Sequence, residues 1–271
     1  MDKINVIKVG GAVVEDPASL GELINQFATM PGYKVLVHGG GRSATKIAAQ
    51  LGIESHMVGG RRITDEDMLQ VVTMVYGGLV NKRIVAALQA KGVNAVGLTG
   101  ADMDIIRSHK REPKMVTMDD GSQQLVDFGF VGDVDSANGR RLAALIKPQE
   151  GVEAVVPVVA PLTHDGKGNI LNTNADTMAA TVAKALTEEF EVTLTYCFEK
   201  TGVMADADDD DSVIPTINTE SYAQLKADGI VSGGMIPKLD NAFDSISSGV
   251  KRVVITHFMD IQASMGTVIE K

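Results

Sequence analysis

Short apolar runs rich in valine and isoleucine alternate along the chain with segments whose apolar residues recur at helical spacing. The first of these predict a strand at residues 4–9, a helix at 19–29, a strand at 34–37 and a helix at 43–51. Strands that alternate with helices form a mainly parallel sheet, because each parallel connection needs a crossover. We therefore predict an α/β fold with a mainly parallel open sheet covered on both faces, a three-layer αβα sandwich.

The same alternation returns later in the chain after an interruption in its middle. Two β-like runs around glycines predict a hairpin at residues 57–64, and polar–apolar alternation over 110–135 predicts small antiparallel strands that form a lid or rim. Helices are expected at 65–76, 81–90, 175–186 and 236–247, and strands at 93–98, 152–159, 192–198 and 252–256. The sequence shows no internal repeat, so we expect one domain or two closely joined lobes.

Composition narrows the class of protein. The 271 residues are 44% hydrophobic with no tryptophan, and the one cysteine, Cys197, excludes an internal disulfide and a cysteine zinc cluster. No apolar stretch approaches the roughly 20 residues of a membrane span and the first residues lack a signal-peptide pattern, so a cytoplasmic location and no membrane are expected. A net charge of −10 argues against a nucleic-acid partner, so an anionic substrate needs a local positive site.

A lysine interrupts the first apolar run. In "IKVGG", Lys8 stands near the carboxyl end of the predicted strand, directly before a glycine turn. Ligands bind at that edge of an open α/β sheet, so the side chain could meet an anion. A lysine whose ammonium extends from an edge strand into water explains the same pattern equally well.

A second glycine turn, "HGGGRS", follows the next predicted strand. Ser43 is a candidate N-cap, so free backbone N–H groups and the positive helix end would meet at one point, where anions bind. Gly39, Gly41 and Ala44 also fit the dinucleotide fingerprint GxGxxA, but no acidic residue stands about 20 positions later at the end of a second strand. If the first two strands are neighbours, both turns supply amides to one multiply charged group such as a phosphoryl group in transfer.

Polar residues also open two later helices. In "GGMIPK", Pro237 favours a first helical turn, which places Lys238 where the helix dipole disfavours a cation and suggests an anionic partner. In "NTNAD", Asn174 is a suitable N-cap and Asp176 a suitable first-turn acid, while Asn172 has no such explanation. Asp176 could also hold two lysines in place. The acidic run at 206–211 lacks the glycine and glutamate of an EF-hand loop and predicts a solvated loop.

Seven ordered segments, "KVGG", "HGGGR", "GRRIT", "NK", "AVGLTGAD", "NTNAD" and "GGMIPK", together resemble the N-acetyl-L-glutamate kinases of the amino acid kinase family. The resemblance spans nearly the whole chain. It implies transfer of the ATP γ-phosphate to the side-chain carboxylate of N-acetyl-L-glutamate, the second step of arginine biosynthesis. It also implies a single domain with an acylglutamate lobe over residues 1–173 and an ATP lobe over 174–271.

The resemblance assigns roles to individual residues. Lys8 and Lys238 would bind the transferring phosphoryl group, and Asp176 would orient both lysines. Backbone amides of the turn residues would bind phosphate and substrate, and Arg62 with Asn172 would hold the acylated amino acid; the turn residues are Gly10, Gly11, Gly40 and Gly41. No protein metal site is expected, since Mg²⁺ would be held mainly through the ATP phosphates. A substrate carboxylate is already anionic at neutral pH, which fits the lack of a candidate catalytic histidine.

Two departures from the family pattern leave alternatives open. The segment aligned with the family's "TDVxG" reads "CFEKTG", with Glu199 and Lys200 at positions expected to contact nucleotide. Arginine-inhibited hexameric members carry an extra N-terminal helix, so an arginine-insensitive homodimer is expected here. Another acceptor, such as aspartate, carbamate or N-succinyl-L-glutamate, stays possible, and the last needs a further cation from Arg61, Lys82 or Arg83. A catalytically silent amino-acid sensor is disfavoured because both lysines are kept.

Overall fold

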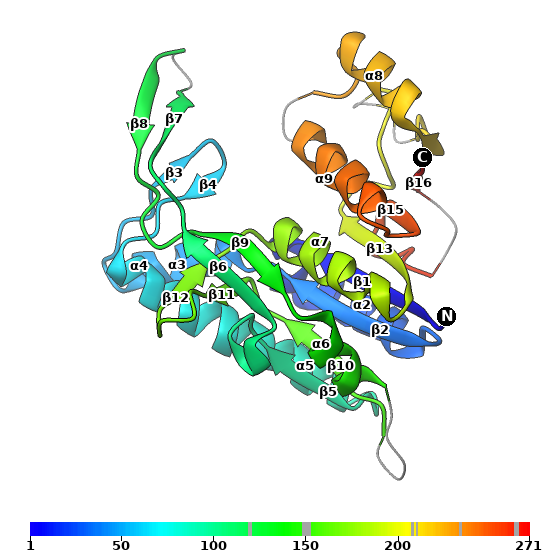
Figure 1. Ribbon diagram of the computed structural model, residues 1–271, viewed down its shortest axis with the longest axis horizontal. Helices are drawn as coiled ribbons and strands as arrows, with labels where there is room; N and C mark the ends of the chain where they lie inside the picture. The colour runs from blue at the N-terminus through cyan, green and yellow to red at the C-terminus, as the bar shows by residue number, and fades with distance from the viewer. Residues whose placement is uncertain (119–120, 148–152, 207–208, 210, 233–234, 263–265) are drawn as a thin grey trace.

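The computed structural model describes the chain except residues 119–120, 148–152, 207–208, 210, 233–234 and 263–265. An eight-stranded sheet lies at its centre, in the order β14-β16-β15-β13-β1-β2-β10-β5 (Figure 1). The strands are β1 (Lys3–Val9), β2 (Tyr33–His38), β5 (Ala95–Leu98), β10 (Val156–Val159), β13 (Glu191–Phe198), β14 (Thr216–Ile217), β15 (Arg252–His257) and β16 (Thr267–Ile269). All neighbouring pairs are parallel except β15 with β16, which confirms the predicted mainly parallel sheet.

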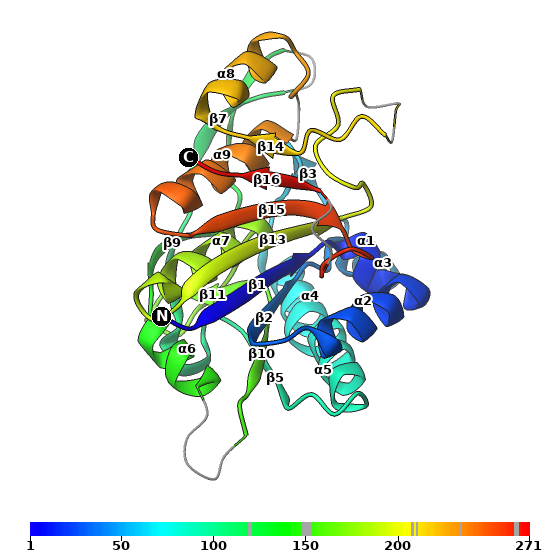
Figure 2. The same ribbon diagram turned by 90° about the vertical axis from the view of Figure 1, so that its right-hand side faces the viewer.

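Helices cover both faces of this sheet (Figure 2). Strand residues alternate faces, so Val35 and Val37 join the core cluster on one face while Leu36 joins the cluster on the other. The first face carries α6 (Gly139–Ile146), α7 (Ala175–Ala185) and α9 (Met235–Ser247), with α8 (Thr219–Ala227) beyond them. The second carries α1 (Gly11–Glu15), α2 (Pro17–Thr29), α3 (Gly41–Gln50), α4 (Glu66–Val72) and α5 (Asn81–Gln89). The three-layer αβα sandwich is confirmed.

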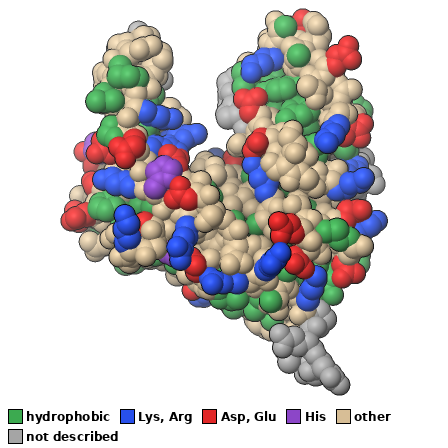
Figure 3. Space-filling view, viewed as in Figure 1, with side chains coloured by type: hydrophobic (Ala, Val, Ile, Leu, Met, Phe, Trp, Pro, Cys, Tyr) green, Lys and Arg blue, Asp and Glu red, His purple; other side chains and the backbone are tan. Residues whose placement is uncertain are grey.

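Two hairpins rise beside the sheet opposite α8 and α9 (Figure 1). They are β3 (Met57–Val58) with β4 (Arg61–Arg62), and β7 (Lys114–Thr117) with β8 (Gln123–Val126). A small core of Val126, Phe128 and Val131 packs against Val58 and Val116 and joins them. A four-stranded sheet of β12 (Ile170–Asn172), β11 (Leu162–His164), β6 (Ile106–Lys110) and β9 (Gly132–Ala137) supports their base. The surface is hollowed between the hairpins and the α8–α9 side (Figure 3).

Some element boundaries differ from the prediction. The helix expected at 43–51 begins at Gly41, and the strand expected at 152–159 begins at Val156, with residue 152 outside the described part of the chain. The helices expected at 65–76 and 81–90 are one continuous helix, because a π-helical segment, η1 (Thr73–Val80), joins α4 to α5. Two glycines in this segment are tolerated since neighbouring turns pack against the sheet.

This joined helix also corrects the expectation about apolar stretches. By length and composition alone, Glu66–Gln89 is apolar enough to cross a membrane. Its buried residues recur at helical spacing, as in Met68, Val75, Ile84 and Leu88, and they belong to the core cluster on the second face of the sheet. The apolar character of this helix therefore serves packing against β10, β2 and α2.

Candidate functional site at the carboxyl edge of the sheet

Lys8 is the last but one residue of β1, as predicted. It lies on the same face of the strand as Ile4 and Val6, whose side chains pack in the core cluster that includes α7 and α9. Its residue surface is 7% exposed, and its ammonium Nζ lies 2.7 Å from Asp176 Oδ1. The alternation of the strand therefore turns this lysine toward the helices that carry the other charged candidates, and not into solvent.

The structure brings Asp176 and Lys238 to the same point. Asn174 accepts hydrogen bonds from the backbone N–H of Asp176 and of Thr177 and caps α7, as expected, so Asp176 lies in the first turn. Lys238 is the fourth residue of α9, which begins two residues before Pro237; the preceding glycines, 233 and 234, lie outside the described residues.

Burial and two neighbouring charged groups change the pKa of Lys238. Burial lowers the pKa of its ammonium, Asp176 raises that pKa, and Lys8 lowers it. The ring of Phe198 lies below both ammonium groups, with its centroid 3.7 Å from Lys238 Nζ and 5.7 Å from Lys8 Nζ. One carboxylate and one aromatic face thus hold two cations close together in a largely dehydrated place, where an additional anion is favoured.

The two glycine turns lie side by side because β1 and β2 are parallel neighbours. The N–H of Gly39 donates to the Val9 carbonyl at 3.0 Å, and a Cβ on Gly39 would come within 3.2 Å of Gly11 N. A Cβ on Gly40 would come within 2.9 Å of the Tyr76 ring. Glycine is required here for close approach of the turns to each other and to the helix below.

The expected N-cap at Ser43 is wrong. Helix α3 begins after Gly40, which as a glycine offers no side chain to cap it. The N–H of Ser43 already lies inside the helix and donates to Glu15 Oε1 at 2.5 Å. Phosphate binding by the backbone amides of this turn stays a prediction, with Gly40 and not Ser43 at the start of the helix.

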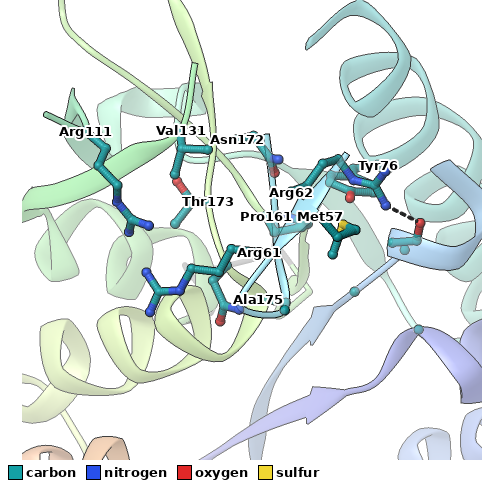
Figure 4. A pocket seen from close by; sticks show the side chains of 16 residues that line it. Met57, Arg61, Arg62, Tyr76, Arg111, Val131, Pro161, Asn172, Thr173 and Ala175 are labelled. Atoms are coloured by element: carbon teal, nitrogen blue, oxygen red, sulfur yellow. Dashed lines mark hydrogen bonds between the residues drawn. The ribbon is translucent and has the colours of Figure 1, made fainter. Parts of the chain in front are cut away.

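Two pockets meet at these turns. The first, called here the arginine pocket, has a volume of about 220 Å³ and is lined among others by Gly11, Gly41, Arg61, Arg62, Arg111 and Asn172 (Figure 4). The second, the lysine pocket, has a volume of about 480 Å³ and is lined among others by Lys8, Gly10, Gly11, Gly41, Glu199 and Lys238. Gly40 lines the arginine pocket, Gly10 lines the lysine pocket, and Gly11 and Gly41 line both.

Arg62 and Asn172 are fixed in the wall of the arginine pocket. Arg62 Nη2 donates to the Gly41 carbonyl and to Thr45 Oγ1, both at 2.8 Å, and Nη1 donates to Ser55 Oγ at 2.6 Å. Asn172 Nδ2 donates to Thr64 Oγ1 at 2.9 Å. Each residue is 8% exposed, so both predicted substrate residues are preorganised by the protein before any ligand binds.

Several pocket residues were missed by sequence reasoning. Arg111 follows β6 in a region predicted only as a rim, and Tyr76 stands in a helix predicted only by its apolar period. Phe198 stands at the end of a predicted strand, and nothing in its neighbours indicates that two lysines lie over its ring. Glu199 and Lys200, which interrupt the family pattern, do line the lysine pocket.

The described residues contain no cluster of side chains that could bind a metal ion. No group of three or more histidine, cysteine, aspartate or glutamate side chains occurs among those residues. The acidic run at 206–211 falls partly outside them. The carboxylate of Asp176 is paired with the ammonium of Lys8.

His38 supports the second glycine turn from inside the protein. Its Nδ1–H donates to the Gly39 carbonyl at 2.7 Å, and its Nε2 lies 3.1 Å from Asn81 Nδ2, which also donates to the Val158 carbonyl. Since a carbonyl only accepts, the proton lies on Nδ1, and the neutral ring joins the turn to the long helix. Burial lowers the pKa of His38 to about 4.

The low pKa of His38 predicts that the protein loses stability in mild acid. Below about pH 6.5 the unfolded chain binds a proton at this histidine that the folded protein refuses down to about pH 4, so the free energy of unfolding falls over that window, by about 2 kcal/mol at pH 5. Urea unfolding of the native protein and of His38→Gln at several pH values measures the difference. Identical pH dependence in both proteins would contradict it.

Known proteins resemble this chain in sequence and in fold. It matches the sequence profile described as the amino acid kinase family over residues 3–257. An acetylglutamate kinase of Bacteroides thetaiotaomicron is 61% identical over 270 residues, which cover 100% of this chain and 99% of that protein. A crystal structure of a Streptococcus mutans protein is similar with a TM-score of 0.74 and 25% identity, covering 98% of both chains. Carbamate kinase of Giardia lamblia bound to AMP-PNP has a TM-score of 0.65 at 15% identity, covering 100% of this chain and 98% of its own, and so shares the fold.

Proposed function

Because the chain belongs to the amino acid kinase family, we propose that it transfers the γ-phosphate of ATP to the side-chain carboxylate of N-acetyl-L-glutamate. The observation that carries the proposal is that the arginine pocket and the lysine pocket meet at Gly11 and Gly41. An acceptor in the first pocket and a nucleotide in the second would face each other across these glycines. The relatives named acetylglutamate kinase make the acetyl compound the acceptor that we propose.

The reaction requires positioning and charge more than proton transfer. A side-chain carboxylate oxygen attacks the γ-phosphorus, the bond from that phosphorus to the β–γ bridging oxygen breaks, and ADP and an acyl phosphate leave. The attacking carboxylate is ionised near neutral pH, so no general base is needed. Negative charge on the phosphoryl oxygens is stabilised by Lys8, by Lys238 and by amides of the turns at Gly11 and Gly41.

The donor and the acceptor occupy separate parts of the fold in this proposal. Residues 1–173 hold the acylated amino acid, with Arg62 on the α-carboxylate and Asn172 beside it, and residues 174–271 hold ATP. In this proposal Mg²⁺ arrives with ATP and is bound mainly by its phosphates. A cytoplasmic homodimer completes the proposal, and sedimentation of the purified protein measures its oligomeric state.

The test is a coupled ADP-release assay with Mg²⁺-ATP and N-acetyl-L-glutamate, with trapping of the acyl phosphate by hydroxylamine. We expect ADP release that depends on the acceptor, and a hydroxamate in equal amount. Binding of N-acetyl-L-glutamate without turnover would instead support an amino-acid sensor. Turnover of aspartate or carbamate but not of the acetyl compound would leave the phosphoryl transfer in place and change the acceptor.

We expect Arg62→Lys to raise the KM for N-acetyl-L-glutamate about tenfold with a smaller change in kcat. Lysine cannot reproduce the planar guanidinium that holds Gly41, Thr45 and Ser55 while it faces the pocket. Steady-state kinetics at saturating ATP measures both constants. An unchanged KM, with the defect in Arg61→Lys instead, would move the α-carboxylate to the other face of β4.

A further inference from the structure

Arg42 is an arginine at the start of α3 that the site described so far does not use. It is the second residue of the helix and directly follows Gly41, one of the two glycines that line both pockets. Of these two pockets, as the described residues form them, Arg42 lines the lysine pocket and not the arginine pocket. Its side chain is therefore on the side of the proposed nucleotide and not on that of the proposed acceptor.

The protein itself gives this arginine no partner. Its guanidinium makes no hydrogen bond and no ion pair with any residue that the structure describes. The first turn of α3 contains no acidic residue, and the positive end of the helix dipole disfavours a cation there. The nearby carboxylate of Glu15 accepts from the N–H of Ser43 in the same turn. An unpaired cation at a helix start is explained if a bound anion supplies the missing partner.

The lysine pocket has an excess of positive charge. Its described lining carries four positive side chains and one carboxylate, which are Lys8, Arg42, Lys200, Lys238 and Glu199. The carboxylate of Asp176 adds one negative charge and is paired with Lys8. This excess occurs in a protein whose net charge is −10, so it is local to the pocket. A ligand with several negative charges would balance it.

The proposed donor has one charged part that the lysines and the glycine turns do not account for. In the proposed function Lys8, Lys238 and the turn amides meet the γ-phosphoryl group. The remaining charge of ATP lies on its diphosphate, which gains further charge as the bond to the γ-phosphorus breaks. A guanidinium offers two parallel N–H groups that match two phosphate oxygens, whereas an ammonium acts as a point charge.

We propose that Arg42 binds the diphosphate of the donor nucleotide and stabilises the charge that develops on it as ADP leaves. The inference rests on the proposed function, because it concerns the leaving group of the same phosphoryl transfer. The bonds that form and break are unchanged, and the guanidinium keeps its proton throughout. Arg42 would thus act as a catalytic residue in addition to the two lysines, and it would contribute to the nucleotide site from the half of the chain proposed to hold the acceptor.

The first test measures ADP binding by calorimetry in the presence of Mg²⁺, without turnover. We expect Arg42→Met, which keeps the length of the side chain and removes its charge, to raise the Kd for ADP about tenfold. Its thermal midpoint of unfolding should not fall, because the change removes a cation that the helix dipole disfavours. Loss of affinity without loss of stability separates a ligand contact from a structural role.

The second test measures ADP release with Mg²⁺-ATP and N-acetyl-L-glutamate. We expect Arg42→Met to lower kcat about tenfold, while the KM for the acceptor at saturating ATP changes less than about threefold. Arg42→Lys should regain part of the ADP affinity through its charge. It should keep most of the loss in kcat, because an ammonium does not reproduce the two parallel hydrogen bonds.

Lys46→Met is the matched control. Lys46 is an exposed cation one turn further along α3, and it lines neither the arginine pocket nor the lysine pocket as the described residues form them. Its replacement changes the net charge of the protein and of the helix by the same amount. It should leave the Kd for ADP and both kinetic constants nearly unchanged.

The other outcomes overturn separate statements. If Arg42→Met keeps native ADP affinity and native kcat, the role of Arg42 is wrong and the proposed function stands. A lower thermal midpoint with equal losses for both substrates would give Arg42 a structural role and overturn the inference. An equal loss of ADP affinity in Lys46→Met would show a general effect of charge and would also overturn it. If ADP affinity falls only in Arg42→Met but no acylglutamate reacts with the native protein, Arg42 binds the diphosphate and the proposed function fails.

Discussion

Replacing Lys8 by arginine is expected to lower kcat about 10²-fold to 10³-fold while the KM for both substrates changes much less. The ammonium of Lys8 lies 2.7 Å from Asp176, and Lys8 lines the lysine pocket, so in the proposed function its charge would face the phosphoryl group in transfer. A guanidinium keeps the charge but is wider and planar, and the 7% exposed site gives it no room to take the same position. The loss therefore falls on transition-state stabilisation.

Lys34→Arg provides the control for this change. Lys34 is also a buried lysine, one strand away in β2, but its Nζ donates to the carbonyls of Phe27, Ala28 and Met30 at the end of α2. Its replacement should lower the thermal midpoint of unfolding and leave kcat nearly unchanged. Lys8→Arg with native turnover and native stability would show that Lys8 does not act in phosphoryl transfer.

The position of Lys8 was predictable because it depends on local rules. A β-rich run that ends in glycines predicts both a strand and its end, and the period of two fixes which side chains share a face with Ile4 and Val6. The neighbouring glycine turn followed from the alternation of strands and helices, since sequential strands usually pair in such sheets. These local signals are enough to predict the central sheet and the contact between the two glycine turns that follow β1 and β2.

The contacts that define the arginine pocket depend on distant parts of the chain. Arg61 and Arg111 meet only because the apolar residues Phe128, Val58 and Val116 join two hairpins that are separated in sequence. No local pattern marks that packing. The start of α3 was predicted wrongly for a related reason. The carboxylate of Glu15, at the end of the short helix α1 that was not predicted, accepts a hydrogen bond from the N–H of Ser43. Ser43 is therefore not needed as a cap.

The carboxylate of Asp176 interacts electrostatically with both lysines. It has the position of an ordinary first-turn acid, which the helix dipole stabilises, and the sequence alone explains it on that ground. In the structure its carboxylate also lies against Lys8 and raises the pKa of Lys238, opposing the effect of burial. A single carboxylate therefore pairs with the Lys8 ammonium and opposes the effect of burial on the pKa of Lys238.

Asp176→Asn should consequently lower kcat about 10-fold to 100-fold and shift the pH dependence of what remains. Burial already lowers the pKa of Lys238, so activity in the native protein should fall at high pH as this lysine loses its proton. Without the carboxylate the pKa lies lower still, and the alkaline limb of the kcat–pH profile should move to lower pH. The control is Asp244→Asn, which removes a carboxylate that pairs with Lys184 and likewise links α7 to α9, but at the surface. An alkaline limb that stays in place while kcat falls would give Asp176 a structural role only.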